Sequence, residues 1–355
     1  MGAPAARPPG DSGDPVTVAF DALGAEAGID AVSEGIRMAA ADDIAIRVFG
    51  PAATFAGLAS DQVEIVDTVE MVGNDEEPVR AVRSRPETSI VRAAADVAAG
   101  RSDALASPGS TGATMTAALF ALKRIRSVQR PALAVEIPAP GRERPLLMLD
   151  VGANADARAS HLVQFAYLGS AFAAAVLGLP DPRVGLLSVG TEEKKGSALV
   201  VEAHEALRGS TGIRFAGNVE GRDLIDPEVE VVVTDGFTGN VALKTIEGTA
   251  RAVGDAVRRA ARSGPIAATG GLLLRPALGG LRADMDPDAT GGAILLGLRG
   301  VAVVGHGSSG PLGIANQIRL AARSVREGAV ERTEELIERS GVGRSAIRGA
   351  KGSES

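Results

Sequence analysis

Residues 231–248 read VVVTDGFTGNVALKTIEG, an apolar run followed by residues of types that can bind an anion. The pattern predicts a buried strand, a tight turn at Asp235 and Gly236, and then a helix. A helix start carries unpaired backbone N–H groups at the positive end of a dipole, which favours a bound phosphate. Asn240 and Lys244 would share one helical face below it. An ordinary capped helix with a solvated lysine explains these residues equally well, and both interpretations stay open.

Three other polar loops follow predicted strands. Lys195 lies in GTEEKKGS, Asn218 in GNVEGRD and His306 in GHGSSG. A lysine can neutralise a phosphate, and a histidine between glycines is exposed, which favours a substrate contact over a core role. Because ligands collect at the carboxyl ends of strands in open α/β sheets, these loops could converge on residues 231–248.

Two further loops have more than one interpretation. SPGSTGA (107–113) permits close backbone approach to an anion or a pantetheine arm, or it only connects two elements. Asp150, Asn154 and Asp156, in DVGANAD, could orient a substrate or satisfy a turn.

Alternating strands and helices must position these loops. The apolar runs predict strands at 16–20, 45–49, 63–66, 103–106, 145–151, 183–189, 213–216 and 294–304. Helical periodicity predicts helices at 29–41, 89–99, 115–122 and 161–177, with two more within 311–340. This alternation indicates βαβ units and a mostly parallel sheet in an α/β fold. We expect one α/β unit over 15–340, in one or two lobes, with disordered or flexible tails at 1–14 and 341–355.

Composition excludes several classes of function. The chain of 355 residues has no cysteine, which excludes disulfides, thiolate metal sites and a cysteine nucleophile. Its three histidines are too scattered for a metal motif, so we expect neither metal nor cofactor. A net charge of −7 argues against a general nucleic-acid binder. Aromatics are only 3%, so the core must be built from Ala, Val, Leu and Ile.

The sequence predicts a soluble, cytoplasmic protein, because it has no signal-peptide pattern and no apolar run of about 20 residues. Residues 264–282, GPIAATGGLLLRPALGGLR, are apolar with nearby arginines. They suit interfacial membrane attachment, and a buried helical hairpin at an oligomer interface is an equal alternative.

Nine motifs in order resemble the phosphate acyltransferase family over about residues 16–326: DALGAE, SPGSTGA, RPALAV, LDVGANAD, HLVQFAYLGSAFA, PRVGLLSVGTEEKKG, FAGNVEGRD, VVVTDGFTGNVALKTIEG and GHGSS. The resemblance implies a three-layer α/β/α fold of the isocitrate/isopropylmalate dehydrogenase type, in a homodimer. It implies fatty acyl transfer from acyl carrier protein to inorganic phosphate, with the acyl phosphate passing to glycerol-3-phosphate acyltransferase for phospholipid synthesis. It also implies peripheral membrane attachment through a hairpin at the place of residues 264–281, which favours the interfacial interpretation.

Some loop residues differ from the family pattern. Glu26 replaces an aspartate, Ser110 an amide, Thr191 a glutamate and Ser197 an asparagine. Each replacement keeps the capacity for hydrogen bonding.

The resemblance and the loops together suggest direct attack of phosphate on the thioester, without an acyl-enzyme intermediate. Lys195 and Asn218 would hold the phosphate, and His306 would donate a proton to the carbonyl oxygen or the leaving thiolate. Predicted substrate-binding residues are Asp21, Gly24, Ser110, Thr111, Gly112, Asn154, Asp156, Asp235, Gly236, Thr238, Asn240, Lys244 and Ser308.

The acidic carrier protein would need a basic surface, for which residues 123–130 and 251–262 are candidates. Alternatives are an acetyl- or butyryltransferase that uses acyl-coenzyme A, or a weakened homologue that serves as a carrier-binding scaffold. A dehydrogenase is disfavoured because no G-x-G-x-x-G follows the first strand.

Overall fold

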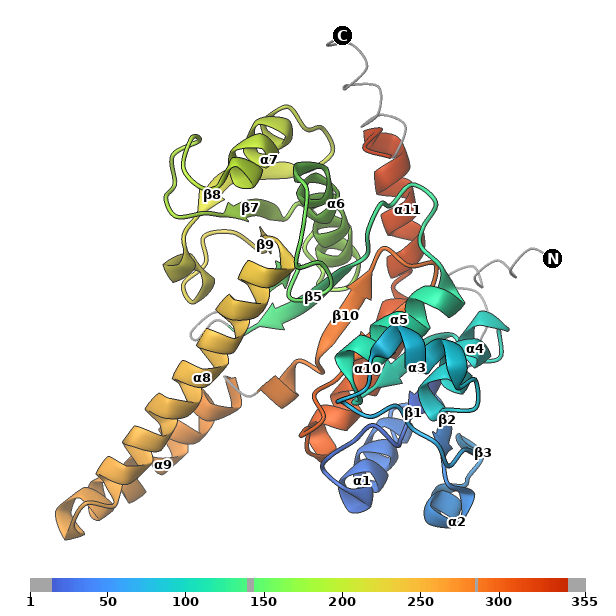
Figure 1. Ribbon diagram of the computed structural model, residues 1–355. Helices are drawn as coiled ribbons and strands as arrows, with labels where there is room; N and C mark the ends of the chain where they lie inside the picture. Colours follow the sequence, from blue (N-terminus) through green and yellow to red (C-terminus); the bar gives the residue numbers. More distant parts are fainter. Residues whose placement is uncertain (1–14, 139–143, 285–286, 344–355) are drawn as a thin grey trace.

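A computed structural model describes residues 15–138, 144–284 and 287–343. Its strands form one sheet of eleven strands (Figure 1). The order across the sheet is β3-β2-β1-β4-β11-β10-β5-β6-β9-β7-β8. The first part contains β1 (Thr17–Asp21), β2 (Ala45–Gly50), β3 (Val63–Asp67), β4 (Ala104–Ser107) and β11 (Val301–Val304). The second contains β6 (Leu146–Leu149), β7 (Arg183–Leu187), β8 (Arg214–Val219) and β9 (Val231–Val233). Between them lie β10 (Ala293–Leu296) and β5 (Ala132–Ile137). The tails predicted at 1–14 and from 344 onward lie outside the described residues.

The two parts of the sheet run in opposite directions. β1, β2, β3, β4 and β11 are mutually parallel, and so are β6, β7, β8 and β9. Between β11 and β6, three successive antiparallel pairings involve β10 and β5, with Ala293 opposite Val304 and Leu296 opposite Ala132. The carboxyl ends of β1, β4 and β11 therefore lie at one edge, called the first edge. Those of β6, β7, β8 and β9 lie at the opposite, second edge.

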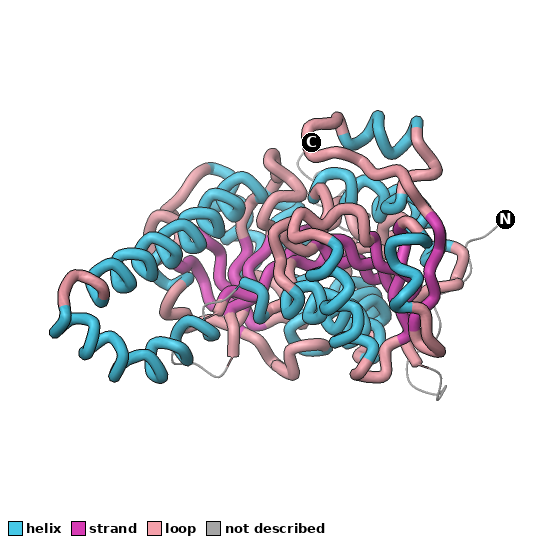
Figure 2. Tube along the Cα trace, turned by 90° about the horizontal axis from the view of Figure 1, so that it is seen from below, coloured by secondary structure: helices cyan, strands magenta, loops and turns pink. Residues whose placement is uncertain are grey.

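Helices cover both faces of this sheet and make the three-layer α/β/α architecture (Figure 2). One face packs against α1 (Ile29–Ala40), α6 (Ala159–Ala175), α7 (Ala198–Arg208), α10 (Pro311–Arg326) and α11 (Ala329–Ser340). The other packs against α3 (Pro78–Ser84), α4 (Ser89–Ala98), α5 (Thr111–Leu122) and the first part of α8 (Gly236–Ala261). Short elements complete the chain: α2 (Ala52–Phe55), η1 (Ala56–Leu58), η2 (Gly221–Leu224) and η3 (Pro287–Ala289).

Alternation along the strands explains why both faces are covered. In β1, Val18 and Phe20 enter one core and Ala19 enters the other, because successive side chains point to opposite faces. Both cores are mainly aliphatic, as the composition predicts. Several of the few aromatic residues, such as Phe20, Phe165 and Tyr167, are among the largest fully buried side chains, whereas Phe237 is exposed.

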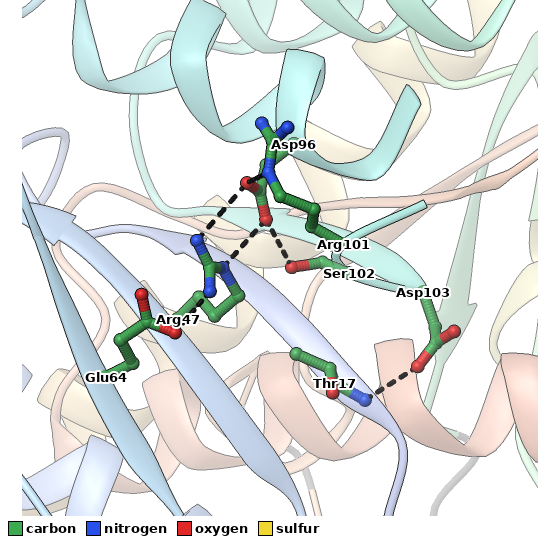
Figure 3. A network of polar contacts seen from close by, with 7 residues as sticks. All are labelled: Thr17, Arg47, Glu64, Asp96, Arg101, Ser102 and Asp103. Atoms are coloured by element: carbon green, nitrogen blue, oxygen red, sulfur yellow. Dashed lines mark hydrogen bonds and ion pairs between the residues drawn. The ribbon is translucent and has the colours of Figure 1, made fainter. Parts of the chain in front are cut away.

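Polar contacts fasten the outer strands to α4 (Figure 3). Asp96 is 2% exposed, and its carboxylate accepts hydrogen bonds from Arg47 Nε (2.9 Å), Arg101 Nε (2.6 Å) and Ser102 Oγ (2.7 Å). Arg47 also pairs with Glu64 on β3. One buried carboxylate thus ties β2 to α4 and to the residues that lead into β4.

A two-helix arm projects from the body (Figures 1 and 2). α8 crosses the sheet face, where Ala242, Leu243 and Ile246 pack on the core, and then continues beyond it. α9 (Pro265–Asp284) returns alongside, so residues 264–281 do not fold back on themselves but form one side of a hairpin with α8. No helix within the described residues is both long and apolar enough to cross a membrane.

Two strand predictions were wrong in detail. Residues 294–304 form two antiparallel strands, because Gly297 adopts a φ of 90° in the turn between them. The strand expected at 213–216 continues to Val219, past a bulge where Gly217 has a φ of 101°. Asn218 therefore lies within β8 rather than in the loop that follows it.

Candidate functional site

At the second edge, Asp150 shapes the loop that follows β6. Its Oδ1 accepts hydrogen bonds from the backbone N–H of Leu133 (3.0 Å), Gly152 (3.2 Å) and Ala153 (2.9 Å). Its Oδ2 accepts two from Asn154, at 2.7 Å from the backbone N and 2.8 Å from Nδ2. The buried carboxylate is thus occupied by its own loop and by β5, and it positions the Asn154 backbone rather than a substrate.

The start of α8 lies directly on this loop. The Gly236 N–H donates to the Asn154 carbonyl (2.9 Å), and a Cβ at position 239 would stand 1.9 Å from the Asp150 carbonyl oxygen. Asp235 caps the helix, with Oδ1 accepting from Thr238 N (2.8 Å) and Oδ2 from Thr238 Oγ1 (2.7 Å). The contacts thus describe a capped helix, the simpler of the two interpretations.

Side chains predicted to contact substrate at this edge are exposed: Asp156, Lys195, Thr238, Asn240 and Lys244. Lys244 forms an ion pair with Glu247 at 2.8 Å, so its charge already has a partner on α8. Lys195 makes no ion pair with any described residue.

Asn218 holds the loop that carries Lys195. Its Nδ2 donates to the Glu192 carbonyl (2.9 Å), and its Oδ1 lies 2.9 Å from His204 Nδ1. Ser188 Oγ donates to the Lys195 carbonyl at 2.9 Å. The 7% exposed Asn218 amide is therefore engaged with protein, and it sets the place from which Lys195 reaches into solvent.

At the first edge, Asp21 is buried among hydroxyl groups. Ser107 Oγ donates to Asp21 Oδ2 (2.8 Å), Thr114 Oγ1 donates to Ser107 Oγ (3.2 Å), and Leu23 N donates to Asp21 Oδ1 (3.3 Å). Burial raises the pKa of Asp21 above its ordinary value, although the hydrogen bond from Ser107 opposes the rise. This carboxyl therefore has an increased tendency to hold a proton.

Glycines let the loops of the first edge touch. A Cβ at Gly24 would stand 2.3 Å from the Cα of Gly109, so a side chain there would separate the loops that follow β1 and β4. Ser110 caps α5 through Ala113 N (3.5 Å), Thr111 is exposed, and Gly112 faces the Pro78 ring.

The His306 loop joins the same edge. Gly305 N donates to the Ser107 carbonyl (2.9 Å), and Glu26 N donates to the Gly307 carbonyl (2.8 Å). Asn74 Nδ2 donates to Glu26 Oε1 at 3.0 Å, so Glu26 reaches a third loop. The exposed His306 ring lies with Nδ1 2.8 Å from Ser308 Oγ.

The structure thus assembles the predicted residues into two groups. Asp21, Gly24, Ser110 and His306 meet at the first edge, while Asn154, Asp235, Lys195 and Asn218 belong to the second. The prediction that the loop after Gly305 converges on the start of α8 is wrong for a single chain, because the sheet reverses direction between them.

Sequence reasoning missed several contacts of these loops. Ser107 and Thr114 surround Asp21, and Asn74 anchors Glu26. Ser107 ends a buried strand just before a glycine loop, and that place could have identified it. Asn74 carries no such signal. No cluster of three or more His, Asp or Glu side chains that could hold a metal occurs in the described parts of the chain.

The chain matches the family described as "Fatty acid synthesis protein" over residues 16–332. It is 41% identical to the phosphate acyltransferase of Bacillus licheniformis over 325 residues, which cover 90% of this chain and 98% of that protein. It is 42% identical to the phosphate acyltransferase of Lactococcus lactis subsp. cremoris over 308 residues, which cover 85% of this chain and 92% of that protein.

A solved structure shares the fold. The phosphotransacetylase from Streptococcus pyogenes aligns with a TM-score of 0.59 at 16% identity, over 90% of this chain and 95% of that one. The sequence relatives carry the functional assignment, because they extend over nearly the whole length of both proteins and bear one name. The chain belongs to the phosphate acyltransferase family, enzymes that transfer an acyl group to phosphate.

Proposed function

We propose that this enzyme takes a fatty acyl group from an acyl carrier protein thioester and transfers it to inorganic phosphate. The acyl phosphate would then pass to a glycerol-3-phosphate acyltransferase and enter phospholipid synthesis. Acyl transfer to phosphate follows from the family, while the carrier-bound donor is the part that we add. The observation that supports this donor is a group of exposed arginines along α8 and at its C-cap, on a chain of net charge −7: Arg251, Arg258, Arg259 and Arg262.

These arginines suit an acidic carrier. Arg258 pairs with Asp255 at 2.9 Å, while the others extend along the projecting arm. Charged surfaces of opposite sign mainly speed association, so docking should weaken as salt rises. The second candidate dock, residues 123–130, has Lys123, Arg126 and Arg130 exposed.

Direct attack by phosphate accounts for the chemistry without a cysteine. A phosphate oxygen adds to the thioester carbonyl carbon, the tetrahedral oxyanion collapses, and the C–S bond breaks. The departing thiolate takes a proton. Lys195 is the candidate cation for the incoming phosphate, Asn218 positions its loop, and His306 is the candidate proton donor.

We infer that the enzyme works as a homodimer in which one copy supplies His306 and the other Lys195. The inference is supported by the opposite edges on which these residues lie within one chain. Mixing inactive Lys195→Ala and His306→Ala chains should then restore about a quarter of the activity, because half of randomly formed dimers are mixed and each holds one intact site. Two active parental variants, or no recovery in mixed dimers, would refute the shared site.

The arm also suggests peripheral membrane attachment of a cytoplasmic enzyme. Ile266 is 91% exposed, and Leu272, Leu273 and Leu274 are 57–77% exposed, close to the arginines of α8. Such a surface suits the interface of an anionic bilayer. Co-sedimentation with anionic vesicles should fall when Leu272 and Leu273 are both changed to serine.

A donor assay tests the central proposal. Purified enzyme is given phosphate and acyl groups of several chain lengths, each on acyl carrier protein or on coenzyme A, and acyl phosphate is measured. We expect higher kcat/KM with the carrier protein. Equal or better use of acyl-coenzyme A would instead favour the alternative donor, which the fold shared with phosphotransacetylase suggests. Unchanged kinetics in Lys195→Ala would remove that residue from the phosphate site.

A further inference from the structure

The segment 127–131 is fastened to the start of α6. Gln129 N donates to Gln164 Oε1 (2.8 Å), and Gln164 Nε2 donates to the Ser127 carbonyl (2.9 Å). Asn154 Nδ2 donates to the Pro131 carbonyl at 2.8 Å. Arg130 lies between two residues held in this way, so its exposed side chain emerges beside the first turn of α6.

The first turn of α6 is itself cationic. Arg158 is its N-cap residue, where a helix ordinarily has Ser, Thr, Asp or Asn. The backbone N–H of Arg158 donates to His161 Nδ1 at 3.2 Å. A neutral His161 ring must then carry its proton on Nε2, which becomes a hydrogen-bond donor. The His161 side chain is 7% exposed, and its Nε2 makes no hydrogen bond with the described residues.

These positive groups lack a counter-charge. Arg158 contacts the ring through its backbone, and Ser160 Oγ donates to Gln129 Oε1 (3.4 Å), which brings the neighbouring Arg130 to the same turn. Burial lowers the pKa of His161, and the charges of Arg130 and Arg158 lower it further. Within the described residues, neither arginine forms an ion pair with a carboxylate. Two exposed arginines near the positive end of a 17-residue helix add to its positive potential, which favours a bound anion.

The start of α8, which lies on the same loop, offers less to an anion. Its cap is the carboxylate of Asp235, and its Gly236 N–H is taken by the Asn154 carbonyl. Asn154 joins the two places, because its backbone supports α8 and its side chain holds the Arg130 segment.

We propose that Arg130, Arg158, the Nε2–H of His161 and the first turn of α6 form a binding site for a phosphate group. The assignment of a role in catalysis rests on the proposed function, whereas phosphate binding itself does not. Two sources carry this chemistry: the inorganic phosphate acceptor and the phosphodiester of the donor's phosphopantetheine arm. Planar guanidinium groups and an imidazole N–H suit the tetrahedral oxyanion in either case.

The test uses Arg130→Gln, Arg158→Gln and their double variant in the full-length chain. Arg214→Gln is the matched control. Arg214 is also exposed, but it begins β8 at the first edge, away from the proposed site, and its ion pair with Asp181 is long (3.5 Å). The dissociation constant for inorganic phosphate is measured by ³¹P NMR titration, which needs no donor and no turnover. The KM values for phosphate, for acyl-phosphopantetheine and for the acyl carrier protein thioester are measured in parallel.

If the site holds inorganic phosphate, each variant should weaken phosphate binding about ten- to a hundredfold, the worth of one charge-assisted hydrogen bond. If it holds the pantetheine phosphodiester, the KM for acyl-phosphopantetheine should rise by a similar factor while phosphate binding stays unchanged. Arg158→Lys should recover part of either loss, and Arg214→Gln should show none.

The proposal is overturned if the folded double variant keeps both affinities. It is also overturned if only the KM for the carrier protein rises, because Arg130 would then contact the protein rather than a phosphate. If the enzyme binds phosphate through these arginines but does not accept acyl groups from the carrier protein, the proposed donor is refuted and the phosphate site is still supported.

Discussion

Replacing Gly239 by alanine should destabilise the protein, whereas the same replacement at Gly248 on the same helix should stabilise it. A Cβ at position 239 would stand 1.9 Å from the carbonyl oxygen of Asp150, and ordinary contact begins near 3.4 Å. The start of α8 must therefore move by about 1.5 Å, the difference between these distances. At Gly248 no atom lies within 4 Å of such a Cβ.

The size of the effect follows from what this movement breaks. The hydrogen bond from Gly236 N to the Asn154 carbonyl, now 2.9 Å, would be lost at a cost of about 1 kcal/mol. Overpacking against the fixed loop adds about 1–3 kcal/mol, while alanine returns up to about 1 kcal/mol of helix propensity. The net loss at Gly239 is about 1–3 kcal/mol, against a gain of about 0.5–1 kcal/mol at Gly248.

Urea unfolding of the two variants and the wild type measures these differences, with acyl phosphate formation measured in parallel. Gly239→Ala should also lose activity, because the 150–154 loop and the Arg130 segment move with α8. Equal midpoints for the two variants would refute the close approach on which the argument rests. A Gly239→Ala enzyme with lowered stability and full activity would separate α8 from the site.

Three more predictions rest on buried polar groups. Asp96→Ala should cost about 3–5 kcal/mol in urea unfolding, because Arg47 loses a buried partner, while Glu64→Ala, at an exposed pair, should cost about 1 kcal/mol or less. Gln317→Leu should stabilise the fold by about 1–3 kcal/mol, because neither amide atom of this 1% exposed side chain has a partner; a lower melting temperature would contradict this. The pKa of Asp21 is raised in the folded state. The contribution of this carboxyl to the free energy of unfolding is therefore complete below pH 3.8, its ordinary pKa, and is lost as pH rises through the raised pKa. Asp21→Asn should therefore gain stability relative to the wild type across that pH range, and a constant difference would count against the buried acid.

Most secondary structure could be predicted because the apolar runs are bounded by turn residues. The strand expected at 45–49 is β2, Ala45–Gly50, and the helix expected at 89–99 is α4, Ser89–Ala98. The continuous prediction at 294–304 failed because GAILLGLRGVAVVG is apolar on both sides of its turn. Periodicity does not separate one buried strand from two, and the positive φ of Gly297 appears only in the structure.

The composition of each site loop and some of its neighbours could be predicted, but the placing of the two groups of loops on opposite edges could not. The proximity of Asp21 to Ser110, and that of Asp235 to Asn154, follows from the rule that parallel strands gather their carboxyl ends at one edge. Which edge each group occupies depends on the antiparallel pairings of β10 and β5. Those pairings join residues far apart in the sequence, such as Ala132 with Leu296, and no local pattern encodes them.

The reversal of the sheet separates two kinds of chemistry. The first edge holds an exposed imidazole and a buried carboxyl with a raised pKa, groups that hold or donate protons. The second edge holds Lys195, Arg130 and Arg158, cations suited to phosphate. The reaction that we propose would use both, since the acceptor phosphate is held as an anion while the departing sulfur takes a proton. In the proposed function both kinds of group act on one carbonyl, and their places on opposite edges of one chain are the reason why we infer a site shared between two copies.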